Sequence, residues 1–495
     1  MRRDRWRLTA WLLAGAALLG GAAGPKELVR EGHAEETPRP TASAQTAAPV
    51  ADVQRLVDRL AKDVGELGGR LSATVVDVSS GRVVAENAGH TRLNPASNQK
   101  LLTAALALDR LGSEHEFTTS LLGELRDGRV GELVLRGRFD PTLDAARLRG
   151  LVEEIRRRGV RSVGAVLVDQ EGFEGPYVPP AFEQQPNEWA AFRAPVAPTS
   201  YERNTLTFWF APGAEGAPVE VLVDPPGIVS VEGSVSTSKK GAGEKIKLTL
   251  SSRGGAITAS LGGSFAAGSA PLAVARRADD PSLLGGHALS ALLAERGIRV
   301  EGSVRAGSSP RAAVLASSSS ASVGELLSRL GKDSDNFTAE MLFLAAGAAG
   351  ERPSFDRSRE AARALLAARG VPTEEWSVTN GSGLFRANEV SSFAMAKLLR
   401  EEVHRPRTAP ETLSHLAIGG VDGTLKNRLK KLASSRVVRA KTGTLADTVA
   451  LSGYVLDSSG APRFSFSFLT AGVKGHSSDA REAIDRAVVD LAQVY

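Results

Sequence analysis

The sequence predicts an α+β fold in which one antiparallel sheet is built from both ends of the chain. Three observations support this prediction. The two ends mirror each other, because each combines one amphipathic helix pattern with short alternating strands. The middle of the chain first alternates helix and strand patterns and then becomes almost purely strand-like. Finally, 495 residues exceed one ordinary domain, so we expect two or three compact units.

The N-terminal segment has the pattern of a secretory signal peptide. Residues 1–7 are basic, residues 8–19 are apolar, and Gly21-Ala22-Ala23 offers a small-residue cleavage site. We therefore predict a signal peptide over residues 1–23 and a mature chain that is periplasmic. An uncleaved N-terminal anchor is the alternative, and any other membrane association is expected to be peripheral. Residues 24–50 are rich in Pro, Ala, Thr and Glu and predict a linker.

Both chain ends contribute to the expected sheet. A first helix begins near residue 51, and two strands follow at 71–78 and 82–86. The apolar face of this helix consists of Val53, Leu56, Val57, Leu60 and Val64. The C-terminal end offers strands at 437–441, 449–456 and 463–470 and then a final helix with Ala483, Ile484, Ala487, Val488 and Leu491 on one face. The economical arrangement is one sheet covered by both terminal helices.

The middle of the chain predicts two inserted units. A hairpin, a helix and a strand form a small α/β unit, and a helix later leads back to the outer domain; these elements are expected at 121–135, 148–158, 163–169 and 287–296. Short strands with Gly- and Pro-rich breaks between residues 205 and 261 predict a nested all-β module. The expected domains are 51–116 with 297–495, 117–198 with 264–296, and 199–263.

Composition excludes several classes of protein. A hydrophobic content of 42% and a charged content of 24% are typical of a soluble globular chain. The net charge is only +5 and basic residues form no long block, which argues against nucleic-acid binding. The chain contains no cysteine, which excludes disulfides, thiolate metal sites and a Cys nucleophile. The seven histidines show no metal-ligand spacing such as H-E-x-x-H, so we expect neither a metal nor another cofactor.

The first candidate for chemistry is a Ser–x–x–Lys pair at a helix start. Asn94-Pro95 predicts the start, with Asn as the N-cap, so Ser97 and Lys100 lie one turn apart on the same face. A helix N-terminus disfavours a second positive charge and favours an oxyanion. A neutral Lys100 amine could therefore accept the proton of Ser97. Taken alone, however, this short motif predicts only an ordinary helix start.

Two further polar clusters change that interpretation. Residues 332–336 (Lys-Asp-Ser-Asp-Asn) lie between two apolar helix patterns, and residues 439–445 (Arg-Ala-Lys-Thr-Gly-Thr-Leu) lie at the end of a predicted strand. Either cluster alone is typical of a polar loop or a strand end. Ser–x–x–Lys, Ser–Asp–Asn and Lys–Thr–Gly in this order are the motif set of class A β-lactamases and penicillin-binding proteins. A helix start, an interhelical loop and an edge strand can converge on one cleft.

Six stretches carry a resemblance to a known family. They are 95–103 (PASNQKLLT), 140–143 (DPTL), 334–340 (SDNFTAE), 381–384 (GSGL), 420–425 (GVDGTL) and 441–445 (KTGTL). From about residue 51 to the C-terminus, the chain resembles the D-alanyl-D-alanine carboxypeptidases/endopeptidases of the low-molecular-mass, class C penicillin-binding proteins. The resemblance implies a β-lactamase/transpeptidase-like domain, an antiparallel sheet with helices on both faces, with inserted domains between the first two motifs.

The resemblance also implies a catalytic set. Ser97 would be the acylated nucleophile and Lys100 its general base. Ser334 would pass a proton to the leaving group, Asn336 would orient the substrate amide, and Lys441 would support Ser334 electrostatically. The implied activity is a serine-type D-Ala-D-Ala carboxypeptidase, endopeptidase, or both, acting on peptidoglycan stem peptides. The family is inhibited covalently by β-lactam antibiotics.

The implied substrate-binding residues are Thr442, Gly443, Thr444, Asp140 and Arg386. The two threonines would lie near the terminal carboxylate, and the backbone N–H groups of Ser97 and Thr444 would form the oxyanion hole. Asp140 and Arg386 match positions that can contact the charged side-chain end of the stem peptide.

The chain departs from the family pattern at two places. Gly137-Arg138-Phe139 stands where the family usually has Gly-x-Gly, and Asn380 and Phe385 replace the usual Asp and Ser around GSGL. These changes affect peptide preference more than acylation. Two other functions share parts of the pattern: a β-lactamase-like hydrolase, for which no deacylating Glu can be assigned, and a catalytically silent wall-binding protein, against which the intact motif set argues.

Overall fold

The computed structural model describes residues 50–494 except 174, 187, 254–255, 309–311 and 349. The expected signal peptide at 1–23 and nearly all of the expected linker at 24–50 lie outside the described residues. Helix α1 (Val50–Glu66) opens the described part. Within that part, no helix combines the length and the apolar character that a bilayer-crossing segment needs.

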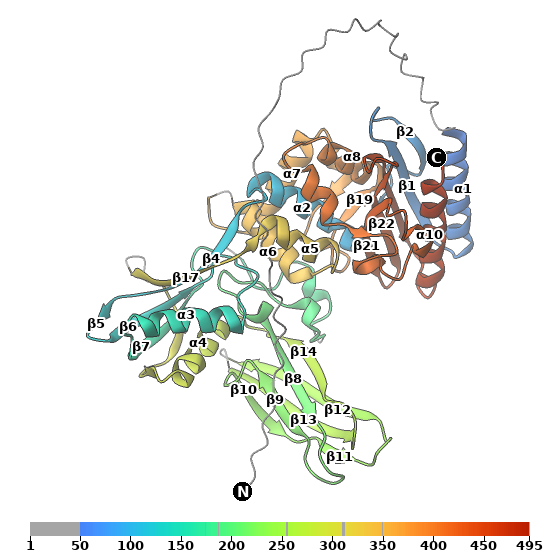
Figure 1. Cartoon of the computed structure of the whole chain (residues 1–495). Helices are drawn as coiled ribbons and strands as arrows, with labels where there is room; N and C mark the ends of the chain where they lie inside the picture. Colours follow the sequence, from blue (N-terminus) through green and yellow to red (C-terminus); the bar gives the residue numbers. More distant parts are fainter. Residues whose placement is uncertain are drawn as a thin grey trace, which may run out of the picture. The chain divides into compact units, whose positions relative to one another are not determined.

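A six-stranded antiparallel sheet combines both ends of the chain, as predicted (Figure 1). Its strands, in spatial order, are β2 (Val83–Asn87), β1 (Arg70–Asp77), β23 (Pro462–Ala471), β22 (Thr448–Leu456), β21 (Val438–Leu445) and β20 (Ala417–Ile418). The N-terminal strand β1 pairs with the C-terminal strand β23 along its whole length, from Arg70 opposite Ala471 to Asp77 opposite Phe464. This pairing fixes the position of the two chain ends relative to each other.

Alternate residues of β23 point to opposite faces of the sheet, and each face is covered by its own layer of helices. Phe464, Phe466 and Phe468 point into a core shared with α1 and α10 (Ser477–Ala492). The alternate residue Ser465 points the other way and donates a hydrogen bond to the carbonyl of Ala396 in α8 (Ser392–Val403), at 2.9 Å. The fold class, α+β with helices on both faces, is therefore confirmed. Figure 1 shows α1 and α10 side by side on their face of the sheet.

The second helical layer carries the elements nearest to the site. Its other members are α2 (Gln99–Arg110), α5 (Val323–Gly331), α6 (Asn336–Ala348), α7 (Phe355–Ala368) and α9 (Ala409–Ser414). Leu and Phe side chains of α2, α5 and α6 form one apolar cluster with residues of α7 and α8. A small three-stranded sheet lies beside this layer and consists of β18 (Trp376–Ser377), β19 (Glu389–Ser391) and β3 (Arg92–Leu93).

An α/β unit is inserted after α2 and contains a seven-stranded sheet. The strands are β15 (Arg299–Val300), β7 (Ser162–Asp169), β6 (Arg129–Arg136), β4 (Glu116–Gly123) and β17 (Ala313–Ser322), with β16 (Val304–Ala306) beside β7 and β5 (Leu125–Arg126) beside β6. Helix α3 (Ala145–Arg157) connects the parallel pair β6 and β7. Helix α4 (Leu284–Glu295) precedes β15.

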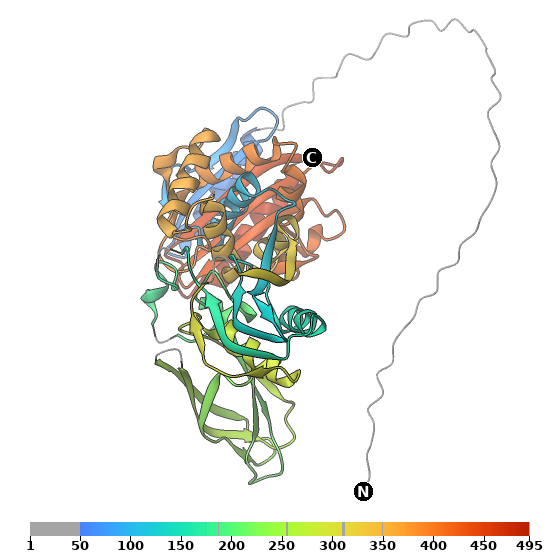
Figure 2. The ribbon, with the colours of Figure 1, turned by 90° about the vertical axis from the view of Figure 1, so that its left-hand side faces the viewer.

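Nested in this unit are two smaller sheets of short strands (Figure 2). One contains β14 (Leu272–Arg277), β8 (Thr205–Ala211) and β9 (Glu220–Asp224); the other contains β10 (Val229–Gly233), β13 (Ala256–Ala266), β11 (Ser236–Ser238) and β12 (Glu244–Arg253). Leu206, Phe208 and Phe210 alternate inward along β8 into a core shared with the α/β unit. The two inserted parts therefore share one apolar core.

Two expected domain boundaries differ from the structure. The nested β structure continues past residue 263 to Arg277, because β14 pairs with β8 along its whole length. The outer domain resumes at Val323 and not at 297, because β17 runs back along β4 and stays in the inserted sheet. The serine-rich β17 has little apolar alternation, so its sequence gave no strong strand signal.

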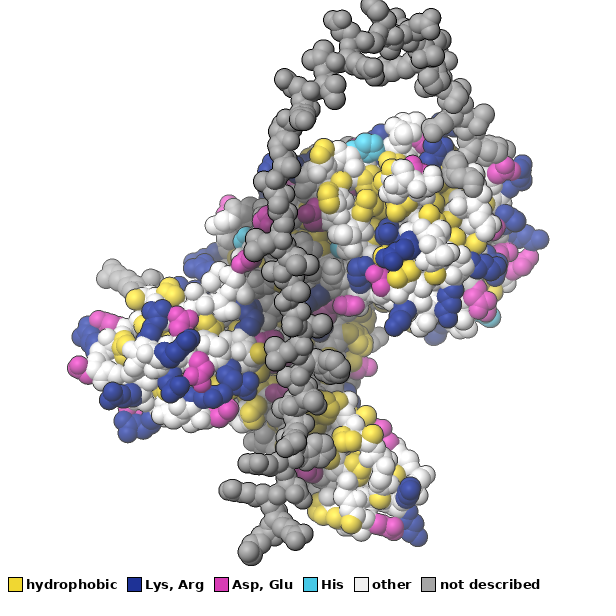
Figure 3. Space-filling model, viewed as in Figure 1, with side chains coloured by type: hydrophobic (Ala, Val, Ile, Leu, Met, Phe, Trp, Pro, Cys, Tyr) yellow, Lys and Arg dark blue, Asp and Glu magenta, His cyan; other side chains and the backbone are white. Residues whose placement is uncertain are grey.

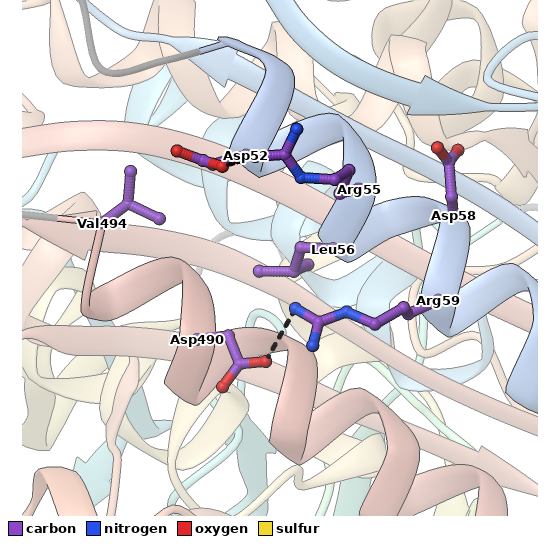
Figure 4. A pocket seen from close by; sticks show the side chains of 7 residues that line it. All are labelled: Asp52, Arg55, Leu56, Asp58, Arg59, Asp490 and Val494. Atoms are coloured by element: carbon purple, nitrogen blue, oxygen red, sulfur yellow. Dashed lines mark hydrogen bonds and ion pairs between the residues drawn. The ribbon is translucent and has the colours of Figure 1, made fainter.

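The surface between the terminal helices is hollowed but carries ordinary ion pairs. Figure 4 shows Arg59 of α1 paired with Asp490 of α10 at 3.3 Å, beside Leu56 and Val494. On the face seen in Figure 3, basic and acidic side chains are interspersed over the described residues.

Candidate active site

Ser97, the predicted nucleophile, lies in a tight turn before α2. Residues Ala96–Asn98 form a 3-10 turn, so the α-helix begins at Gln99, later than the Asn94-Pro95 pattern predicted. Asn94 is not the N-cap, but its Oδ1 accepts a hydrogen bond from the N–H of Ala96 at 2.8 Å at the start of the turn. Asn98 anchors the turn to the central sheet by donating to Ser452 Oγ of β22 at 2.7 Å. Ser97 is half-buried at the open side of this turn.

Lys100 lies one turn after Ser97 and is 1% exposed. Its Nζ lies 2.7 Å from Asn336 Oδ1, 2.7 Å from the Ser382 carbonyl oxygen and 3.1 Å from Ser97 Oγ. Two of these partners are oxygens that can only accept, so they take the two hydrogens of a neutral amine. The lone pair is then left for the hydroxyl of Ser97, which donates to it. This is the geometry of a general base beside its nucleophile.

Burial makes the neutral amine accessible near neutral pH. Desolvation lowers the pKa of Lys100 to about 7, although the nearby carboxylate of Glu340 acts to raise this pKa. Lys441 of β21 is also fully buried, and desolvation together with the charge of Lys100 holds its pKa well below the usual value. A charged Lys100 therefore disfavours the charged form of Lys441.

Ser334 and Lys441 form the second half of the cluster. Lys441 Nζ donates to Ser334 Oγ at 2.9 Å and to the carbonyl oxygen of Thr442 at 2.7 Å. Ser334 adopts a left-handed backbone conformation with φ of 59°, which is uncommon for a residue with a side chain. The turn between α5 and α6 thereby directs the Ser334 hydroxyl to the lysine of β21.

Neighbouring residues hold the Ser-Asp-Asn turn in place. Asp335 caps α6 by accepting from the N–H of Thr338 at 2.7 Å, and it also pairs with Arg203 of the inserted region. Asn336 uses both ends of its amide: Oδ1 accepts from Lys100, and Nδ2 donates to the carbonyl of Phe192 at 3.0 Å. The inserted region therefore reaches the catalytic cluster directly.

The Lys-Thr-Gly strand approaches the nucleophile turn closely. A Cβ on Gly443 would lie only 2.7 Å from the carbonyl oxygen of Pro95, so a glycine is required at this crossing. Thr442 is buried and its Oγ1 lies 2.8 Å from Thr424 Oγ1, whereas Thr444 is exposed. The structure thus brings Ser97, Lys100, Ser334, Asn336 and Lys441 together with Thr442, Gly443 and Thr444.

Arg386 and Asp140 do not share a partner. Arg386 is exposed and pairs with Asp447 at 2.5 Å, in the loop between β21 and β22. Asp140 is 1% exposed, and its carboxylate accepts from Thr119, from Thr142 and from Arg147 at 2.7 Å. Because these residues of its own unit already occupy both carboxylate oxygens, the expected role of Asp140 in substrate binding gains no support from the structure.

The departures from the family pattern have a local explanation. Phe139 stands where a glycine was expected, and it nevertheless keeps a left-handed φ of 64°. Its N–H donates to the carbonyl of Pro198 at 2.7 Å, and its ring packs edge-on against Phe173. Phe385 also has a left-handed φ of 65° and packs against Phe182 of the insertion. Tertiary contacts therefore hold backbone conformations that these residues disfavour.

Three residues at the site had no role in the sequence-based prediction. Glu340 and Ser382 contact the Lys100 environment, and Thr424 contacts Thr442. All three lie inside the motif stretches, at 334–340, 381–384 and 420–425. Among the described residues, no group of three or more His, Cys, Asp and Glu is arranged to hold a metal ion.

Comparison with known proteins agrees with this geometry. The profile of the D-Ala-D-Ala carboxypeptidase 3 (S13) family matches residues 53–494. The chain belongs to this family. The enzyme class predicted from the three motifs, a serine-type D-Ala-D-Ala carboxypeptidase/endopeptidase of the class C penicillin-binding proteins, is therefore confirmed.

Individual relatives of this S13 enzyme match over most of their length. The D-alanyl-D-alanine carboxypeptidase of Actinomadura sp. (strain R39) is 33% identical over 92% of this chain and 87% of its own. The crystal structure of penicillin-binding protein 4 from Haemophilus influenzae is 22% identical, covers 88% of this chain and 99% of its own, and gives a TM-score of 0.75. The same protein in complex with a β-lactam gives a TM-score of 0.70. At this identity, the two structures support the fold.

Proposed function

We propose that this S13 enzyme hydrolyses peptide bonds after D-alanine in peptidoglycan stem peptides or cross-links, through an acyl-enzyme on Ser97. One observation carries the proposal. Lys100 has two acceptor oxygens for its two amine hydrogens, and its lone pair faces the Ser97 hydroxyl. A serine hydroxyl becomes a competent nucleophile only when such a base is within hydrogen-bond reach.

The acylation step follows from these positions. Ser97 Oγ attacks the carbonyl carbon of the penultimate D-alanine while Lys100 takes the hydroxyl proton. Backbone N–H groups of Ser97 and Thr444 stabilise the oxyanion. When the tetrahedral intermediate collapses, Ser334, held by Lys441 at 2.9 Å, gives its proton to the leaving amine and regains the proton that Lys100 took from Ser97. Water then attacks the ester while Lys100 takes its proton and returns it to Ser97 Oγ, which releases the shortened peptide and restores the starting state.

We assign recognition of the substrate's terminal carboxylate to Thr442, Gly443 and Thr444. The hydroxyl of Thr442 is oriented by Thr424, and Thr444 faces solvent where a peptide could approach. β-Lactams carry a carboxylate in a similar position relative to their reactive carbonyl, so we expect them to acylate Ser97 as covalent inhibitors.

The decisive test replaces the nucleophile. Ser97→Ala should abolish both covalent labelling by a fluorescent penicillin and D-alanine release, because no hydroxyl remains to be acylated. Lys100→Ala should slow labelling on the order of 10²- to 10⁴-fold, the usual contribution of a general base. Ser80→Ala, at an exposed turn, is the matched control. A chelator should change neither activity. Labelling of Ser97→Ala at the wild-type rate would place the nucleophile elsewhere.

We further propose that Arg386 contacts the charged side-chain end of the stem peptide. It is 77% exposed, and only Asp447, at 2.5 Å, pairs with its guanidinium among the described residues. Arg386→Ala should slow peptide turnover much more than penicillin acylation, because penicillin lacks that side chain. Arg126→Ala is a close control, since Arg126 is also 77% exposed and pairs with Glu124 at 2.5 Å in the inserted sheet. Equal losses for both substrates would refute the assignment.

We also propose an extracytoplasmic, periplasmic location with cleavage after the 1–23 segment. The support is the pattern of basic, apolar and small residues at 1–23 together with membership of a family that acts on the cell wall. Recovery of the full-length chain from the cytosolic fraction would overturn it.

A further inference from the structure

A buried carboxylate beside Lys100 has no part in the acylation step above. Glu340 lies one turn after Asn336 on α6 and is 0% exposed. Its Oε2 accepts from the N–H of Gly381 at 3.0 Å, and its Oε1 accepts from the N–H of Ser382 at 2.7 Å. A buried carboxylate is costly unless it is hydrogen-bonded, and these two N–H groups offset that cost.

Glu340 and Lys100 hold opposite sides of the same residue. The Ser382 N–H donates to Glu340, and the Ser382 carbonyl accepts from Lys100 Nζ at 2.7 Å. Thr103 of α2 also donates to the carbonyl of Gly381 at 2.6 Å. The segment 381–383 is therefore fixed between α6 and α2. If it moved, Lys100 would lose one of the two acceptors that direct its lone pair to Ser97.

The hydrogen-bond pattern at Glu340 suits the ionised carboxylate. Burial raises the pKa of Glu340, while hydrogen bonds from Ser382 and Gly381 and the charge of Lys100 oppose this rise. Both oxygens accept backbone N–H groups, an arrangement that a negative carboxylate satisfies best. The charge that bears on Lys100 is then that of Glu340 from α6, which favours the ammonium, while the pKa of Lys441 from β21 is itself held well below its usual value by burial and by Lys100.

We propose that Glu340 is the positioning residue of the general base: it fixes the Ser382 carbonyl that takes one hydrogen of Lys100, and its negative charge makes the Lys100 amine a stronger base. The inference deepens the proposed function and rests on it. Without Glu340, the amine would be both misdirected and a weaker base. The negative charge of Glu340 thus raises the pKa of Lys100, and burial lowers it.

The test is the pH profile of penicillin acylation in Glu340→Gln. Glutamine offers one acceptor oxygen where two N–H groups converge, so we expect the maximum rate to fall on the order of 10- to 100-fold. Removal of the negative charge should also move the acid limb of the profile to lower pH, by about one unit. A purely structural role would lower the rate at every pH and leave the limb in place.

Two further variants make the result decisive. Glu402→Gln is the matched control, because Glu402 is also buried, at 3% exposed, but pairs with Arg369 away from the site. It should lower thermal stability and leave the acid limb unmoved. Glu340→Asp keeps the charge but shortens the side chain, so the rate should fall while the limb stays. If Glu340→Gln does not fold, a moved limb in Glu340→Asp would count against the charge effect.

The outcomes separate the inference from the proposed function. An acid limb in Glu340→Gln that coincides with that of the wild type would overturn the inference alone. Failure of the wild-type enzyme to be acylated at Ser97 would overturn the proposed function.

Discussion

At the scale of single residues, the site is organised by the distribution of protons among buried groups. Lys100 and Lys441 are both buried, and each has a hydroxyl within 3.1 Å of its Nζ. Burial disfavours protonation of Lys100, and the charge of Glu340 favours it. Because the resulting pKa is about 7, the proposed base can both accept a proton in acylation and return it afterwards near neutral pH.

This balance predicts the pH dependence of acylation by the wild-type enzyme. The pKa of Lys100 lies at about 7, so the amine is mostly protonated below that pH and cannot accept the Ser97 proton. The rate of penicillin acylation should therefore fall as the pH is lowered through about 7, close to tenfold for each further unit. Stopped-flow measurement of acylation with a fluorescent penicillin gives the profile. A rate independent of pH between about 5 and about 8 would show that Lys100 is not the base.

Several residues of the site have backbone conformations that a side chain disfavours. Ala96, next to the nucleophile, has a φ of 47°, and Ser334 has a φ of 59°. Such conformations cost about 1–3 kcal/mol each and persist only where the surrounding structure imposes them. They direct Ser97 and Ser334 to the two lysines. No local sequence signal predicts them, because Ala and Ser are common in every backbone region.

At the scale of elements, regular alternation was predictable and irregular turns were not. The strand at 463–470 was predicted within one residue at each end, because its phenylalanines alternate with small polar residues. The helix after Ser97 was placed too early, because the 3-10 turn at Ala96–Asn98 has the same composition as a helix start. The three motifs were enough to predict that Ser97, Lys100 and Lys441 lie close together, since a helix start, an interhelical loop and an edge strand can converge on one cleft.

The segment 381–383 gives a testable link between an element and the chemistry. Gly383 has a φ of +77°, and a Cβ there would lie 1.9 Å from the carbonyl oxygen of Ala96. Gly383→Ala should displace the segment from the nucleophile turn and slow penicillin acylation on the order of 100-fold, the effect of a shift of about 1 Å in a catalytic geometry. Acylation rates of purified variants measure the effect.

A second glycine provides the control for this prediction. Gly150 lies in the middle of α3, and nothing lies within 4 Å of a Cβ added there. Gly150→Ala should raise the free energy of unfolding by about 0.5–1 kcal/mol, because alanine is the better helix former, and leave acylation unchanged. Equal acylation by both variants would show that the close approach at Gly383 has no bearing on the site.

At the scale of the whole molecule, the inserted units and the outer domain have separate apolar cores, but they contact each other at the site. One core fills the inserted units, while two others cover the two faces of the central sheet. Phe139, Ala194 and Val196 of the insertion nevertheless pack into the core beside α2 and α6. The carbonyl of Phe192 also contacts Asn336. These contacts join residues far apart in sequence, so motif order predicted the insertion but not its contribution to the site.

The same long-range packing explains why the predicted role of Asp140 gains no support from the structure. The prediction rested on the match of Asp140 to a substrate-contacting position of the family. In the structure Arg147 of α3 and Thr119 of β4 surround it. A motif match assigns a residue type to a position, but burial and competing partners decide whether that residue is available to a ligand.

The separate cores predict that stability and chemistry can be uncoupled. Phe208 is 0% exposed in the core of the inserted units, and Phe468 is equally buried beneath the terminal helices. Phe208→Ala and Phe468→Ala should each lower the free energy of unfolding by about 3–5 kcal/mol through loss of burial and formation of a cavity.

In Phe208→Ala, penicillin acylation measured well below the unfolding transition should stay within about threefold of wild type, because distant sites act nearly independently. With increasing urea, peptide turnover in Phe208→Ala should fall before penicillin acylation does, since the insertion packs Phe182 against Phe385, next to Arg386, whose proposed contact only the peptide makes. In Phe468→Ala the two activities should fall together, because Phe468 supports the sheet that carries the Lys-Thr-Gly strand. Joint loss of both activities in Phe208→Ala would instead show that the inserted units and the catalytic domain unfold as one cooperative structure.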